Sequence, residues 1–124
     1  MSLLLALAMQ IASDPVTARQ DEIVVIGQKQ KNWRGNLKHK KGVPFCKTTR
    51  STGDKEIDKI GCDAMIICFP IHGSSLMKLA KQYKKKSEFN AAAKPIYAEM
   101  GNCVFKNRDQ GISELADKRL GIVQ

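Results

Sequence analysis

The apolar residues of this chain follow a strand-like pattern up to about residue 50 and a helix-like pattern after it. Residues 21–28 (DEIVVIGQ) have a β-branched apolar centre closed by Gly27, which is typical of a short buried strand. Two further strands, joined around residues 39–42 (HKKG), can place four apolar side chains on one face: Trp33, Leu37, Val43 and Phe45. We therefore expect a small antiparallel sheet of about three strands with a basic hairpin tip.

The second half of the chain predicts about four helices. Asp54 is a good N-cap, and the apolar residues from Ile57 to Cys68 recur at helical spacing. The expected helices begin near Asp54, Ser74 or Ser75, Ser87, and Asp109 or Ser113, and they end near Pro70, Lys86, Asn102 and Gly121. Because the strands precede the helices, the order predicts an α+β fold.

Residues 1–18 have the features of a secretory signal peptide. The run from Leu3 to Ala12 is apolar but too short to span a bilayer, and residues 16–18 (VTA) place small residues at the −3 and −1 positions of a cleavage site. A buried N-terminal helix is the alternative, since this segment contains no Lys or Arg. We predict a signal peptide over 1–18 and a single domain over 19–124, periplasmic or secreted, with no transmembrane segment after cleavage.

All four cysteines lie after the predicted cleavage site, and an even number in a small exported domain favours two disulfides. They are Cys46, Cys62, Cys68 and Cys103. A zinc site with four thiolate ligands is less favoured, because the paired short spacings of zinc ligands are missing. Free buried thiols are the third possibility. We predict no metal site and no cofactor.

Helical geometry excludes one of the three possible disulfide connectivities. Cys62 and Cys68 are six residues apart on one predicted helix, hence about 9 Å apart along its axis, whereas a disulfide needs Cα atoms within roughly 7 Å. Pairing Cys46 with Cys62 joins the last strand to the first turns of the next helix, and leaves Cys68 for Cys103. We prefer this pairing to Cys46–Cys68 with Cys62–Cys103, which stays open.

The chain is strongly basic, with a formal net charge of +9. One basic group follows the hairpin and a second lies on one predicted helix face; the residues predicted to bind anions are Lys38, Lys40, Lys41, Lys78, Lys81 and Lys85. Such charge attracts polyanions or only keeps the surface soluble. Trp33 next to Arg34 is either a stacking platform or, as we prefer, a core residue. Because export separates the protein from most nucleic acid, we expect an anionic envelope component or an envelope protein as its partner.

The sequence lacks a convincing catalytic constellation. His39 lies in the basic turn, and His72 with Ser74 is more typical of a local cap than of a catalytic pair. No phosphate loop or cluster of metal ligands is present. We therefore predict no catalytic residues and no enzyme activity, with a small hydrolase as a distant alternative.

Two short segments resemble parts of the TonB energy-transduction system. Residues 21–27 (DEIVVIG) resemble the Ton box of TonB-dependent outer-membrane receptors, commonly EIVVTG. Residues 46–62 (CKTTRSTGDKEIDKIGC) resemble part of the C-terminal domain of TonB-type transducers, where a strand ends in a T-R-S-S-G-like turn and a helix carries Leu-Asp. That domain grips a Ton box as an added strand, so the resemblance implies that Ile23–Ile26 pairs with the hairpin.

The resemblance has limits, because the final strand of the transducer domain is missing and the chain is too short for a receptor barrel. The whole order of elements also resembles small uncharacterised exported bacterial proteins, which implies a location and no activity. The sequence thus predicts a non-enzymatic envelope binding or accessory module that acts through its basic face or a sheet edge. A secreted cationic effector that acts on anionic membranes is the alternative.

Overall fold

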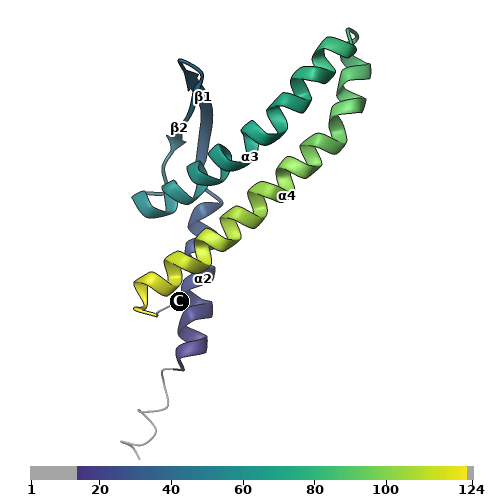
Figure 1. Cartoon of the computed structure of the whole chain (residues 1–124). Helices are drawn as coiled ribbons and strands as arrows, with labels where there is room; N and C mark the ends of the chain where they lie inside the picture. The colour runs from purple at the N-terminus through teal and green to yellow at the C-terminus, as the bar shows by residue number, and fades with distance from the viewer. Residues whose placement is uncertain (1–13, 123–124) are drawn as a thin grey trace, which may run out of the picture.

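The computed structural model describes residues 14–122 and has α+β architecture, with three helices and one two-stranded antiparallel sheet. The elements follow the chain in the order α2 (Pro15–Gln30), β1 (Arg34–Lys40), β2 (Val43–Arg50), α3 (Lys55–Gln82) and α4 (Lys86–Arg119). Helices α3 and α4 form a long antiparallel hairpin, and α2 packs across one end of it (Figure 1).

The predicted β-hairpin is confirmed. Strands β1 and β2 pair antiparallel, with Leu37 opposite Cys46 and Lys40 opposite Val43. The two turn residues, Lys41 and Gly42, both have positive φ angles of 52° and 80°. This backbone is the one that a two-residue hairpin turn requires, because its twist matches that of the flanking strands.

The third predicted strand is wrong, because residues 21–28 belong to helix α2. Asp14 caps this helix by accepting a hydrogen bond from the Val16 backbone N–H at 3.0 Å, and Pro15 occupies its first turn. Ile23 and Ile26, three residues apart, face the core together, whereas Val24 and Val25 are exposed. The segment therefore has a helical burial period, and it does not pair with the hairpin as a strand.

The prediction of four helices after the hairpin is wrong, because the structure has two long helices, α3 and α4, in their place. Helix α3 continues through Pro70, and α4 continues through Pro95 and residues 101–102. An internal proline removes one backbone hydrogen bond and costs roughly 3 kcal/mol. Packing of α3 along α4 offsets this cost, and the Cys68–Cys103 disulfide fixes the two helices to each other close to Pro70.

The hydrophobic core lies where the three helices meet. Its buried side chains come from all three: Ile26, Ile57, Ile60, Leu115 and Ala116. Beyond this junction α3 and α4 continue as a pair that neither α2 nor the sheet covers (Figure 1). We refer to residues 66–104, which form this pair and its turn, as the helical arm.

The turn from β2 into α3 is fixed by the carboxylate of Asp58. It accepts hydrogen bonds from the Thr52 backbone N–H at 2.8 Å, from the Thr52 hydroxyl at 2.7 Å and from the Ser51 hydroxyl. Burial acts to raise the pKa of Asp58, but these hydrogen bonds outweigh it and the pKa is lowered. The predicted N-cap of α3 is confirmed as well, since Asp54 accepts from the Glu56 N–H.

The disulfide pairing preferred from the sequence is confirmed. Cys46 is bonded to Cys62 and Cys68 to Cys103, with Cα–Cα distances of 5.4 and 5.8 Å. All four cysteines are therefore oxidised, which excludes both the thiolate zinc site and the free thiols. Two disulfides are consistent with an oxidising, extracellular compartment.

The first residue after the predicted cleavage site anchors helix α2. The Arg19 Nε lies 2.7 Å from a carboxylate oxygen of Asp117 on α4, and Asp117 is buried. The predicted cleavage would leave this ion pair in place. Residues 1–13 lie outside the described part of the chain, so the signal peptide stays a prediction.

Candidate functional site

The six lysines predicted to bind anions lie at two separate places. Lys38, Lys40 and Lys41 surround the turn of the β-hairpin, whereas Lys78, Lys81 and Lys85 lie at the far end of α3. Figure 1 shows that the two turns are apart from each other, although both lie toward the upper side of the view. The structure therefore does not bring the six lysines into a single patch.

The carboxylates are paired mainly at the opposite end of the α3–α4 hairpin. Arg119 lies 2.6 Å from Asp54, and Lys118 lies 2.8 Å from Glu56. The Arg119 hydrogen bond lowers the pKa of Asp54 and the Lys118 hydrogen bond lowers the pKa of Glu56. In residues 14–122, none of the six lysines forms an ion pair with a carboxylate.

The exposed face of α3 in the helical arm changes from apolar to basic toward the turn. Ile67, Ile71, Ser74, Lys78 and Lys81 are three or four residues apart and so lie on one helix face. Of the apolar residues on this face, Ile67 is 49% exposed and Ile71 is 63% exposed. On the opposite side of α3, Cys68 and His72 face α4.

Helix α3 is long and apolar enough to span a membrane by length and composition alone. It has 28 residues, and only 28% of its most apolar stretch is buried inside the protein. The core helix of a soluble protein passes the same test but is mostly buried. The low burial of α3 thus marks this helix as one with an uncovered apolar surface.

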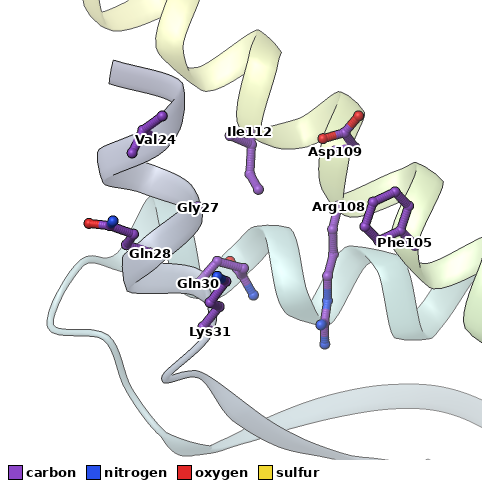
Figure 2. A pocket seen from close by; sticks show the side chains of 9 residues that line it. All are labelled: Val24, Gly27, Gln28, Gln30, Lys31, Phe105, Arg108, Asp109 and Ile112. Atoms are coloured by element: carbon purple, nitrogen blue, oxygen red, sulfur yellow. The ribbon is translucent and has the colours of Figure 1, made fainter. Parts of the chain in front are cut away.

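A second candidate site is a pocket between α2 and α4 with a volume of about 510 Å³. Figure 2 shows Gln30 at the end of α2, in front of α3, and Arg108 reaching down from α4. The Gln30 Nε2 lies 2.8 Å from the place that a Cβ on Gly61 of α3 would occupy. Val24 and Ile112 lie on the upper side of the pocket and Phe105 lies beside Arg108. Besides these apolar residues, the pocket is lined by five polar or charged ones: Gln28, Gln30, Lys31, Arg108 and Asp109.

Trp33 lies under the Arg108 guanidinium and is a core residue, as we preferred from the sequence. Its indole is buried, and the Nε1–H donates to the Thr48 hydroxyl at 3.0 Å. The Arg108 guanidinium lies 5.7 Å from the ring centroid, close enough for a cation–π contact. Burial of its ring leaves no open stacking platform for a nucleic acid base.

The structure does not assemble His72 and Ser74 into a pair. Both lie on α3 two residues apart, so their side chains point to different sides of the helix. The His72 Nδ1 instead lies 3.8 Å from a carboxylate oxygen of Glu99 on α4, and His39 lies in β1 near the turn. Within residues 14–122, no group of three or more His, Cys, Asp or Glu is arranged to hold a metal ion. The absence of enzyme activity stays a prediction.

The fold and these sites define a disulfide-linked α+β protein with a protruding helical arm. No family model, curated protein or solved structure matches the chain. The resemblances to the Ton box and to the transducer domain therefore stay untested.

Proposed function

We propose that this protein is a non-enzymatic envelope module, periplasmic or secreted, that attaches to anionic membrane surfaces through the helical arm. The observation that carries the proposal is the face of α3 on which exposed Ile67 and Ile71 are followed by Lys78 and Lys81. An apolar face next to a basic end is the combination with which helices lie in the membrane interface.

Both parts of this face contribute to membrane binding. Each lysine close to an anionic surface adds about 1 kcal/mol, and the arm turn carries Lys84, Lys85 and Lys86 besides the two on α3. Burial of an exposed isoleucine or methionine side chain adds about 1.5–3 kcal/mol. Both contributions favour attachment of the helical arm to an anionic surface.

The tip of the β-hairpin has the same combination on a smaller scale. Val43 is 64% exposed and lies beside Lys40 and Lys41. Val43 and Ile71 are thus equally exposed apolar residues near basic turns, and they provide a matched pair for a test. If the arm is the principal contact, only the substitution on α3 should matter strongly.

The test measures co-sedimentation of the oxidised full chain with vesicles of phosphatidylcholine alone or with a third phosphatidylglycerol. We expect binding to the anionic vesicles only, and a decrease in binding with rising salt. Ile71→Ser should weaken binding about tenfold or more, whereas Val43→Ser should change it less than threefold. Likewise, the double variant Lys78→Glu, Lys81→Glu should bind more weakly than Lys38→Glu, Lys40→Glu.

Three results would contradict the proposal. They are equal binding to neutral vesicles, no binding at micromolar protein, and a larger loss with the β-hairpin variants than with the arm variants. The last result would assign the contact to the β-hairpin.

The low burial of α3 favours one second candidate, a cationic effector that permeabilises anionic membranes. Release of a dye trapped in the same anionic vesicles separates the two functions. Attachment without dye release identifies a binding module, and dye release at micromolar protein identifies an effector.

A further inference from the structure

We propose that the pocket between α2 and α4 binds one molecule that has an apolar chain and a single carboxylate, such as a medium-chain fatty acid. Arg108 and Gln30 would hold the carboxylate, and the apolar walls of the pocket would cover the chain. This site is distinct from the face of α3 that carries the proposed membrane attachment.

The first argument is the unpaired polar atoms at the pocket. Gln30 is 3% exposed, and neither its Nε2 nor its Oε1 has a hydrogen-bond partner in the described part of the chain. The buried Nε of Arg108 also lacks a partner there. A buried polar group without a partner costs about 1–3 kcal/mol. These atoms have almost no exposed surface in the folded chain, so a ligand would recover that free energy only if the two side chains turned toward the opening.

The second argument is the charge around Arg108. Burial lowers the pKa of its guanidinium, and the nearby positive charge of Arg34 lowers it further. Asp109 also lines the pocket, but Figure 2 shows its carboxylate directed away from the Arg108 guanidinium. Two cations close together, one of them half-buried, form a site for an anion, and a guanidinium fits a carboxylate through two parallel hydrogen bonds.

The third argument is the length of the apolar surface. A second hollow of about 410 Å³ shares Phe105 and Arg108 with the pocket and extends along α4 to Tyr97. From Ile112 to Tyr97 the helix rises about 22 Å, which exceeds the length of a twelve-carbon chain. A long apolar path beside the cations Lys31 and Arg108 suits an acyl chain with one anionic end better than a compact polar ligand.

The test uses the fluorescence of Trp33, the single tryptophan of the chain, which lies beneath Arg108. The oxidised protein is titrated with dodecanoate below the concentration at which it forms micelles, and separately with dodecanol and dodecyl phosphate. We expect saturable binding of one dodecanoate, with at least tenfold weaker binding of the alcohol, which lacks the charge. Dodecyl phosphate, whose head also fits a guanidinium, should compete with dodecanoate for the same site.

Glycine substitutions provide a matched pair of variants. A Cβ added at Gly27, on the pocket wall, or at Gly73, on the helical arm, meets no atom within 4 Å. Gly27→Leu and Gly73→Leu should both fold and gain helix stability, because glycine is a poor helix former. Only Gly27→Leu fills the pocket, so it should weaken dodecanoate binding at least tenfold while Gly73→Leu leaves it unchanged.

Arg108→Lys keeps the positive charge but loses the two-pronged guanidinium, and it should also weaken binding. Calorimetry of the same mixtures provides a readout that does not depend on the Arg108–Trp33 contact. The proposal is overturned if dodecanoate does not bind, if the alcohol binds equally well, if dodecyl phosphate does not compete, or if Gly27→Leu binds like the unsubstituted protein.

Discussion

The indole of Trp33 fits between the β-hairpin and α3 because two neighbouring positions have no side chain. A Cβ at Gly35 would lie 2.4 Å from the ring, and one at Gly61 would lie 2.5 Å from it. The sequence indicated a core tryptophan but not these two contacts. Gly61 is far from Trp33 in the chain, and the Gly35 contact depends on how the indole turns over the hairpin. The sequence analysis also did not predict that Gln30 and Arg108 line a pocket, because no motif or spacing marks either residue as part of a site.

The residue-scale prediction concerns Gly61→Ala. Alanine favours the helical backbone by about 1 kcal/mol, but the ring contact forces α3 or the indole to move, at a cost of about 1–3 kcal/mol. We therefore expect a net loss in the free energy of unfolding, measured by urea denaturation of the oxidised protein. Gly73→Ala, which meets no atom, is the control and should be neutral or stabilising. A Gly61→Ala protein as stable as the control would refute the role of this contact.

At the scale of the elements, the hairpin and the start of α3 could be predicted because local signals coincide there. The turn residues and the strand pattern both indicate the β-hairpin, and Asp54 indicates the start of α3, as the structure shows. The prediction of a strand around Ile23–Ile26 was wrong because a short apolar run fits a strand or a buried helix equally well. Its Asp14-Pro15 start signal was assigned to the signal peptide instead.

The prediction of four separate helices was wrong for another reason. In the sequence, Pro70 and Pro95 indicate helix ends. In the structure both helices continue through them, because packing of α3 on α4 and the Cys68–Cys103 bond outweigh the local cost of each proline. Sequence patterns report local preference and cannot supply that tertiary contribution.

The element-scale prediction is that the Cys68–Cys103 bond holds the helical arm together. By the loop-entropy argument a bond that closes a 35-residue separation stabilises by about 3–4 kcal/mol. In the Cys68→Ser, Cys103→Ser variant we expect amide hydrogens of residues 71–100 to exchange at least tenfold faster. The core segments of α2 and α4 should be less affected, because their contacts remain.

The control for this measurement is the Cys46→Ser, Cys62→Ser variant, in which faster exchange should concentrate in the β-hairpin. Equal exchange in residues 71–100 with and without the Cys68–Cys103 bond would show that packing alone holds the arm.

At the scale of the whole molecule, charge is separated along the α3–α4 hairpin. Paired carboxylates join the helices beside the core, and unpaired lysines occupy the turn at the other end. The composition predicted an excess of positive charge and the chain order suggested two basic groups. Only the fold shows that these groups lie on two separate turns.

The whole-molecule prediction is a loss of stability in acid that depends on Asp54. The hydrogen bond from Arg119 lowers its pKa below the ordinary value of 3.8, so the folded chain binds a proton less readily than the unfolded chain. The stabilisation is therefore present above about pH 4 and is lost as the pH falls through the lowered pKa.

Asp54→Asn tests this prediction because asparagine keeps the N-cap of α3 and removes only the charge. At pH 7 the variant should be less stable by about 1 kcal/mol, and the difference should vanish at about pH 2. Denaturant unfolding between pH 2 and 7 gives both values. A difference that is the same at all pH values would exclude the ion pair as its cause.

If a membrane contacted both basic turns and not the arm alone, their separate placement would set how the molecule stands on the surface. Both turns lie on the same side in Figure 1, and α2 extends in the opposite direction. A flat membrane that touches both turns would leave α2 and its pocket facing the aqueous phase, at a distance set by the length of the helical arm. A molecule in that pocket would then be held above the lipid rather than within it.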